Sequence, residues 1–209
     1  MKITNYKVER YMYNLLENRP PIFTEIEEYA RKIDFPIIEP LVGVLINQYA
    51  RLIKAKRILE LGSGFGYSAL WFSQGMDEST EIICTDFRAE NKKLAEKYFK
   101  EAEIKTKIDF RLGDALEILD ELDGKFDIIF NDVEKEDYPK TYKKAIPKLK
   151  TGGLLITDNT LWYGRVTDDN LKDYQTEGSR EYNTLAFKDS RVLSVLLPIR
   201  DGITVSLKT

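Results

Sequence analysis

From Arg57 onward, short strand-like segments alternate with helix-like segments, and this alternation is the feature that most limits the fold. The expected strands are Arg57–Leu61, Glu81–Asp86, Lys107–Leu112, Phe126–Asp132, Gly153–Asp158, Arg191–Leu197 and Ile203–Lys208. The connection between the last two, Pro198–Gly202, is too short for a helical crossover, so these strands are expected to form an antiparallel hairpin. The sequence therefore predicts an α/β fold with a doubly wound, mostly parallel seven-stranded sheet, whose ligand crevice lies at the carboxyl ends of the strands.

Three helical segments are predicted before the first strand, at Asn5–Glu17, Phe23–Asp34 and Pro40–Lys54. The chain has 209 residues and no linker-like stretch. Because a typical domain has about 150 residues, one domain is the better interpretation. We therefore expect a single domain over residues 1–209, with a helical cap, 1–54, followed by a core, 55–209.

The charge balance argues against a partner rich in phosphate groups. The chain carries 32 Lys and Arg against 35 Asp and Glu, a net charge of −3, so no broad basic face is expected. The longest apolar run, Val192–Ile199, is much shorter than the roughly 18 residues of a membrane span. The first residues lack the apolar segment of a secretory signal. We expect a soluble protein with a cytoplasmic location and no membrane partner.

The chain contains no histidine and a single cysteine, Cys84. Without histidine it lacks the commonest general base and the commonest transition-metal ligand, and one cysteine excludes an internal disulfide framework and a Cys-rich zinc site. Any catalysis must therefore use carboxylates, amides, hydroxyls, lysine or arginine. A bound metal would need oxygen ligands, which favours magnesium, calcium or manganese.

A glycine-rich loop follows the first predicted strand, with the spacing G-x-G-x-G and an acid, Glu60, just before it. The glycines Gly62, Gly64 and Gly66 allow a sharp turn and the close approach of a ligand to a helix N-terminus. A dinucleotide fingerprint needs its third glycine one residue later, where this chain has Tyr67. The spacing is instead similar to the cofactor loop of S-adenosylmethionine (SAM)-dependent methyltransferases. A turn that serves only packing is the alternative.

Acidic and amide side chains also follow the other parallel strands. Asp86 ends the second strand, where an acid can bind ribose hydroxyls, and Asp114 follows the third, where it can cap a helix. Asp132 ends the fourth strand, and Asp158 and Asn159 end the fifth. Strands one, four and five are expected to be neighbours, so the oxygens of these last three residues would converge in an open site for Mg²⁺. For either segment alone, an ordinary turn is the alternative.

Five segments of the sequence are similar to those of one family: LELGSGFGYSAL, GDAL, FDIIFNDVEKEDY, GGLLITDNTLWYGRV and the tail REYN…DSR…LPIRDGITV. The family is that of the cation-dependent O-methyltransferases, which includes catechol and caffeoyl-CoA O-methyltransferases and their bacterial relatives. The resemblance extends from about Ile38 to the C-terminus and implies a Rossmann-like class I methyltransferase fold. It also implies two cofactors, SAM and Mg²⁺, with Mn²⁺ or Ca²⁺ as alternatives to Mg²⁺.

The resemblance implies a set of residues that bind SAM. They are Ile38, Glu60, Gly62, Gly64, Ser68, Asp86, Asp114, Ala115 and Asp132. Gly62, Ser68 and the region of Ile38 would line the methionine part, and Asp86 would bind the ribose. The adenine would lie against the Asp114–Ala115 pair.

The resemblance also implies residues for metal binding and catalysis. The metal ligands would be Asp132, Asp158 and Asn159, and the catalytic residues Lys135 and Asp132. Two positions depart from the family pattern: Glu134 stands where bacterial members usually carry Asp, and Asn131 replaces a usual apolar residue. The change at Glu134 affects the substrate assignment more than the metal site. The first three dozen residues, which shape the acceptor pocket in relatives, match poorly.

The activity implied is methyl transfer from SAM to a hydroxyl of a small aromatic substrate with two neighbouring oxygens. Chelation by Mg²⁺ would lower the pKa of that hydroxyl, and Lys135 would accept its proton or stabilise the phenolate. Candidates for a water-excluding wall, each with ordinary packing as the alternative, are Trp162, Tyr163, Tyr6, Tyr11, Tyr13 and Phe23. Arg165 would meet an acidic substrate group or be a solvated surface residue. Analogy with relatives predicts a homodimer.

Three other functions are weighed against this one. The first is tRNA wobble 5-hydroxyuridine O-methylation, which the lysine-rich stretch Lys135–Lys150 favours and the acidic balance disfavours. The second is a non-catalytic cofactor-binding module, which the presence of Lys135 beside the expected metal ligands disfavours. The weakest is a nicotinamide oxidoreductase, because Tyr67 stands in place of the required glycine.

Overall fold

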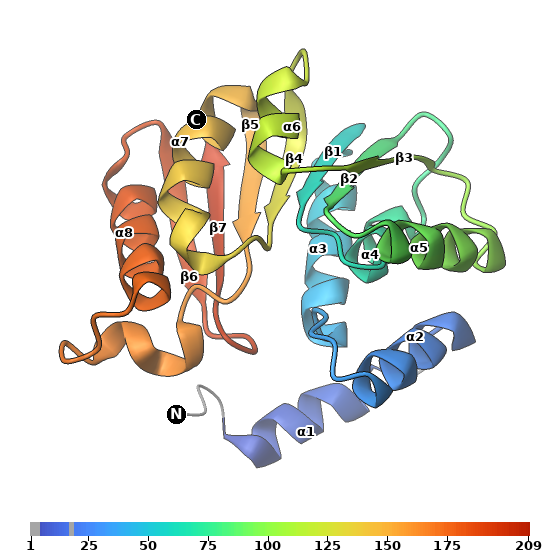
Figure 1. The fold of residues 1–209 in the computed structure, drawn as a ribbon, viewed down its shortest axis with the longest axis horizontal. Helices are drawn as coiled ribbons and strands as arrows, with labels where there is room; N and C mark the ends of the chain where they lie inside the picture. The colour runs from blue at the N-terminus through green and yellow to red at the C-terminus, as the bar shows by residue number, and fades with distance from the viewer. Residues whose placement is uncertain (1–4, 17–18) are drawn as a thin grey trace.

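The computed structural model describes residues 5–16 and 19–209, which form a seven-stranded sheet flanked by helices (Figure 1). The strands are β1 (Arg57–Leu61), β2 (Glu81–Asp86), β3 (Lys107–Leu112), β4 (Phe126–Asn131), β5 (Leu149–Thr157), β6 (Val192–Leu197) and β7 (Ile203–Lys208). Their order is β3-β2-β1-β4-β5-β7-β6. Neighbouring strands are parallel except at β7, which is antiparallel to both β5 and β6. The predicted mostly parallel sheet with a C-terminal hairpin is confirmed.

Four strand boundaries differ from the prediction, among them the start of β6, at Val192 rather than Arg191. β4 and β5 each end one residue early, so Asp132 and Asp158 are the first residues beyond their strands. β5 also begins at Leu149 rather than Gly153, because Leu149 pairs with Phe126 ahead of a register irregularity between β4 and β5. Asp132 and Asp158 therefore lie in the connections at the carboxyl edge of the sheet, where ligands bind in open α/β sheets.

The helices are α1 (Tyr6–Asn14), α2 (Pro21–Lys32), α3 (Pro40–Leu52), α4 (Tyr67–Ser73), α5 (Ala89–Glu101), α6 (Ala115–Glu121), α7 (Tyr138–Lys148) and α8 (Tyr174–Lys188), with 3₁₀ turns η1 (Lys135–Asp137) and η2 (Trp162–Thr167). The first three correspond to the predicted N-terminal helices: α1 and α3 are shorter than expected, and α2 begins and ends two residues earlier than expected. Glu17 lies outside the described residues. Among the described residues, no helix combines the length and apolar character needed to cross a bilayer.

Two hydrophobic cores cover opposite faces of the sheet. Successive residues of a strand point to opposite faces, so Ile58 of β1 belongs to one core and Leu59 to the other. The first core receives side chains from α2, α3, α4 and α5, and the second from α6, α7 and α8. Phe23 of α2 is fully buried in the first core, so the packing interpretation holds for this residue. Helix α1 has no buried residue and lies at the edge of the molecule (Figure 1).

Candidate active site

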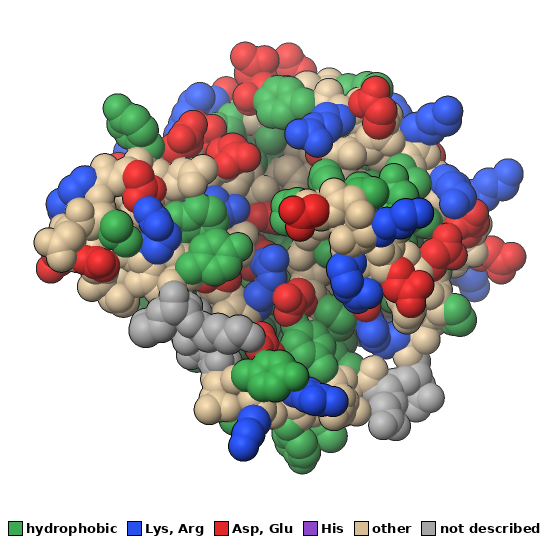
Figure 2. All heavy atoms as spheres, turned by 60° about the horizontal axis from the view of Figure 1, so that its bottom comes forward, with side chains coloured by type: hydrophobic (Ala, Val, Ile, Leu, Met, Phe, Trp, Pro, Cys, Tyr) green, Lys and Arg blue, Asp and Glu red, His purple; other side chains and the backbone are tan. Residues whose placement is uncertain are grey.

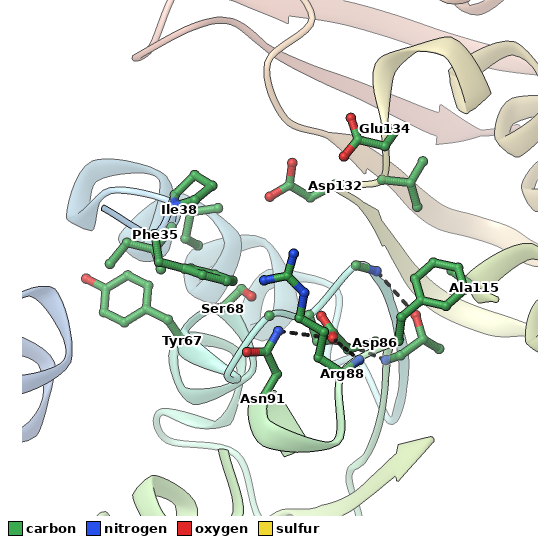
Figure 3. Close-up of a pocket in the computed structure, with 18 of the residues that line it drawn as sticks. Phe35, Ile38, Tyr67, Ser68, Asp86, Arg88, Asn91, Ala115, Asp132 and Glu134 are labelled. Atoms are coloured by element: carbon green, nitrogen blue, oxygen red, sulfur yellow. Dashed lines mark hydrogen bonds between the residues drawn. The ribbon is translucent and has the colours of Figure 1, made fainter. Parts of the chain in front are cut away.

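A cavity of about 620 Å³ opens at the carboxyl edge of the sheet (Figure 3). Every residue expected to bind SAM lines this cavity except Glu60; the lining includes Ile38, Gly62, Gly64, Ser68, Asp86, Asp114, Ala115 and Asp132. Asp132 approaches the cavity from one side, and Ser68 and Asp86 approach it from the other (Figure 3). Residues from five strand ends and from the segment before α3 therefore surround one space.

The glycine loop between β1 and α4 packs directly against the end of β4. Gly62 has a φ of 86°, and a Cβ at this position would lie 2.5 Å from the carbonyl oxygen of Asp132. Gly66 has a φ of 82° and is the N-cap of α4. Only glycine adopts such a conformation cheaply, and only glycine allows this backbone approach. The loop thus serves packing and also brings its backbone to the wall of the cavity.

Glu60 was expected to bind SAM, but it does not line the cavity. It is fully buried beneath the glycine loop, where it accepts a hydrogen bond from the hydroxyl of Ser68. Burial raises its pKa from 4.5 to about 7, although hydrogen bonds from Ser68 and Ser63 oppose the shift. No donor among the described residues reaches its Oε2. Because Ser68 lines the cavity, Glu60 acts on the site through the position of that hydroxyl.

The two acids expected near ribose and adenine are held by local hydrogen bonds. Oδ1 of Asp86 accepts from the backbone N–H of Arg88 at 2.7 Å and from Nδ2 of Asn91 at 3.0 Å. Asp114 is the N-cap of α6, and its Oδ1 accepts from the backbone N–H of Leu116 at 2.8 Å. Both acids also line the cavity, so the capping interpretation of Asp114 and its placement at a ligand site coexist.

Asp132 extends its carboxylate into the cavity (Figure 3). Nζ of Lys135 lies 3.5 Å from its Oδ1. Burial raises the pKa of Asp132, the charge of Lys135 lowers it, and the charge of Asp158 raises it. Two carboxylates from neighbouring strand ends are therefore close enough to influence each other. Lys135 also lies over the rings of Tyr138 and Trp162, 5.5 Å and 5.4 Å from their centroids.

Asp158 is fully buried behind the cavity wall, and both of its oxygens are engaged. Oδ1 accepts from the backbone N–H of Asn159 at 2.8 Å, and Oδ2 accepts from Nη1 of Arg200 at 2.7 Å. Asn159 and Arg200 line the cavity. Sequence reasoning did not single out Arg200. The motif LPIRDG contained the signal, since this arginine lies in the hairpin turn whose second strand pairs with β5.

The chemistry of the donor set fits a hard divalent cation. Asp132 and Asp158 supply carboxylate oxygens, Asn159 has an amide oxygen, and such ligands suit Mg²⁺, Mn²⁺ or Ca²⁺. Among residues 5–16 and 19–209, no three acidic or cysteine side chains cluster as a metal site would require, so the candidate depends on the amide as its third ligand. Arg200 occupies Oδ2 of Asp158, and Asp158 is fully buried and does not line the cavity, so this expected ligand is closed to a cation in the present arrangement.

The remaining candidates lie in different surroundings. Tyr6, Tyr11 and Tyr163 are more than half exposed, and Tyr13 lines a second cavity. The guanidinium of Arg165 binds Asp173 at 2.6 Å at the start of α8, in an ion pair whose side chains are 38% and 41% exposed, so Arg165 lies at the surface and lines neither cavity. Glu134, one of the departures from the family pattern, lines the main cavity beside Asp132 (Figure 3).

A family model described as O-methyltransferase matches residues 21–209. The chain belongs to the O-methyltransferase family. The chain is 37% identical over 169 residues to mouse catechol O-methyltransferase domain-containing protein 1; the match covers 78% of this chain and 64% of that protein. It is also 38% identical over 199 residues to caffeoyl-CoA O-methyltransferase 1 of Eucalyptus globulus, covering 89% of this chain and 81% of the relative.

Solved structures of O-methyltransferases share the whole fold. The O-methyltransferase TomG from Streptomyces achromogenes, which is involved in tomaymycin synthesis and was solved in complex with SAM, superposes with a TM-score of 0.87. It is 27% identical, and the match covers 97% of this chain and 96% of that one. The expected family, the fold and the enzyme class, a SAM-dependent O-methyltransferase, are confirmed.

Replacing Gly62 with alanine tests the close packing of the glycine loop on β4. Gly152→Ala is the matched control, because Gly152 also has a positive φ, 81°, but nothing lies within 4 Å of an added Cβ. Gly152→Ala should lower the free energy of unfolding by about 1–2 kcal/mol through backbone strain alone, and Gly62→Ala should lower it further because its Cβ also clashes with the carbonyl oxygen of Asp132. Only Gly62→Ala should also weaken binding of S-adenosylhomocysteine (SAH) at least tenfold in calorimetry. Equal SAH affinity in the two variants would contradict the packing argument.

Replacing Glu60 with glutamine tests the buried carboxyl. Between about pH 5 and pH 7 the folded protein keeps the proton of Glu60 while the unfolded chain has lost it, so this group makes stability fall as the pH rises. Glu60→Gln should remove this fall in the free energy of unfolding, which is on the order of 3 kcal/mol for a pKa shift of this size. Urea unfolding at pH 5 and pH 8 measures it, with the exposed change Glu96→Gln as control. A pH dependence unchanged from wild type would refute the shift.

Proposed function

We propose that this O-methyltransferase transfers the methyl group of SAM to a hydroxyl of a small aromatic substrate with two neighbouring oxygens, in a reaction that depends on a divalent cation. The observation that carries the proposal is the position of Asp132. Its carboxylate lies in the same cavity as the glycine loop, within 3.5 Å of Lys135, and Asn159 lines that cavity too. A site for the methyl donor therefore adjoins a set of oxygen ligands and a basic side chain.

The proposed orientation of SAM follows from the cavity walls. The adenine lies against Ala115 beside the N-cap of α6, and the ribose hydroxyls bind Asp86. The methionine part lies between Gly62 and Ser68, toward Asp132. This orientation directs the sulfonium group toward the oxygen ligands, where the carboxylates favour a positive charge.

Asp132, Asp158 and Asn159 would hold the cation. A divalent cation bound there would lower the pKa of a coordinated aromatic hydroxyl and align it with the methyl group. Lys135 accepts the proton of that hydroxyl, or in its charged form stabilises the phenolate. Tyr138 and Trp162 hold the ammonium group in place through their ring faces, and Trp162 shields it from water. Because attack of an oxygen anion on a sulfonium cancels charge, a dry site favours the transition state.

A second cavity, of about 470 Å³, is the proposed place for the aromatic acceptor. It shares the segment Phe35–Ile38 and Arg200 with the main cavity. Its other walls include Tyr13, Leu16 and Pro40 from the N-terminal region. The lining also contains four further charged side chains, Arg19, Glu27, Arg31 and Glu39, so the ring would lie against the apolar and aromatic part of the wall. The shared wall puts that ring next to the methyl donor.

A tRNA substrate has less support. The lysines that suggested it are largely paired: Lys143 with Glu181, Lys144 with Asp120 and Lys150 with Asp127, while Lys148 donates to backbone carbonyls. Figure 2 shows acidic and basic side chains interspersed over the viewed face rather than gathered by sign. The expected homodimer and cytoplasmic location stay predictions.

Removal of metal and replacement of Lys135 test the proposal together. With catechol or caffeate and radiolabelled SAM, a chelator should abolish methyl transfer and added Mg²⁺ should restore it.

Lys135→Ala should lower kcat by about 10²–10⁴-fold while leaving SAH affinity unchanged. Lys143→Ala, at an exposed lysine paired with Glu181, is the control and should stay active. Full activity in chelator would contradict the cation dependence.

A further inference from the structure

Arg200 lines both cavities and binds Asp158, one of the three expected metal ligands. It lies in the turn between β6 and β7, and its side chain is 19% exposed. Nη1 donates to Oδ2 of Asp158 at 2.7 Å, and Nη2 donates to the backbone carbonyl of Ile37 at 3.1 Å. Nε lies 4.0 Å from Oε1 of Glu39. The guanidinium is therefore bound at Asp158 and already has two further acceptors on the side of the second cavity.

The turn presents Arg200 in a conformation that favours glycine. Its φ is 52°, a left-handed value that strains any residue with a Cβ. The next residue, Asp201, anchors the turn, because its Oδ1 accepts the backbone N–H of Tyr163 at 2.5 Å. A fixed turn holds the guanidinium against the end of β5. The ion pair with Asp158 offsets the strain of the arginine backbone.

The ion pair with Arg200 limits the access of a cation to Asp158. Asp132 and Asn159 face the main cavity, but Asp158 is fully buried with Arg200 in place. Burial would lower the pKa of Arg200, but the charges of Asp158, Asp132 and Glu39 raise it above its ordinary value. The guanidinium thus balances the same carboxylates that a divalent cation would bind, and it covers the oxygen that such a cation needs.

We infer that Arg200 is an internal cation that competes with the divalent cation for Asp158 and so sets the metal affinity of the enzyme. Metal binding requires the guanidinium to leave Oδ2 of Asp158 and move toward Glu39 and the carbonyl of Ile37. In the absence of metal, the same side chain keeps the buried carboxylate paired. The inference rests on the cation dependence of the proposed function and assigns a specific residue to its control.

Calorimetry with Mn²⁺ in the presence of SAH tests the competition without measuring activity. Arg200→Gly removes the whole side chain and suits the left-handed backbone, and Arg200→Gln replaces the charged guanidinium with a shorter, neutral amide. Both variants should bind Mn²⁺ at least tenfold more tightly than wild type. The matched control is Lys54→Gly, because Lys54 is an exposed cation with a φ of 54° that lies just before the amino end of β1, away from the carboxyl edge that holds the site. This control removes one positive charge and the same backbone strain, and its Mn²⁺ affinity should equal that of wild type.

The outcomes separate this inference from the proposed function. Circular dichroism and SAH binding first establish that each variant is folded. Equal or weaker Mn²⁺ affinity in both Arg200 variants would overturn the competition alone. If wild type and all variants bind SAH but none binds Mn²⁺, the cation dependence fails and the inference fails with it.

Discussion

The site depends on the balance of charge around two carboxylates, Asp132 and Asp158, at the ends of β4 and β5. Each has its own cation in this structure: Lys135 lies 3.5 Å from Asp132, and Arg200 donates to Asp158 at 2.7 Å. Buried carboxylates are costly unless they are paired, so these cations are required wherever no metal neutralises the pair. In this arrangement the carboxylate of Asp132 faces the cavity, whereas the carboxylate of Asp158 is buried against Arg200. Under the proposed function, catalysis and metal binding are linked through the partners of the two acids.

The sheet order explains why these charges meet. β4 lies between β1 and β5, so the glycine loop after β1, Asp132 after β4 and Asp158 after β5 follow three adjacent strands. β7 pairs antiparallel with β5, which brings the β6–β7 turn to the same edge. The missing side chain of Gly62 then lets the loop pack on the backbone of Asp132. A donor site, a set of oxygen ligands and an arginine are thus assembled by connections that are distant in sequence.

Most of this could be predicted from the sequence, because strand ends in a parallel sheet share one edge. The strands, the glycine loop and the acids Asp86, Asp114 and Asp132 follow from periodicity and spacing, and each of these acids lines the cavity. Glu60 does not line the cavity because the alternation of β1 sends its side chain beneath the loop, a direction that spacing alone does not distinguish from the ligand side. Arg200 was missed because its contact with Asp158 spans 42 residues and requires the hairpin to fold onto β5.

Anomalous diffraction from crystals grown with SAH and Mn²⁺ tests the central claim most directly, because it locates the ion and the arginine in one experiment. We expect an anomalous peak for a manganese ion that is coordinated by oxygens of Asp132, Asp158 and Asn159, with the guanidinium of Arg200 displaced from Asp158. A peak at another location, or SAH bound with no manganese and with Arg200 still on Asp158, would contradict it.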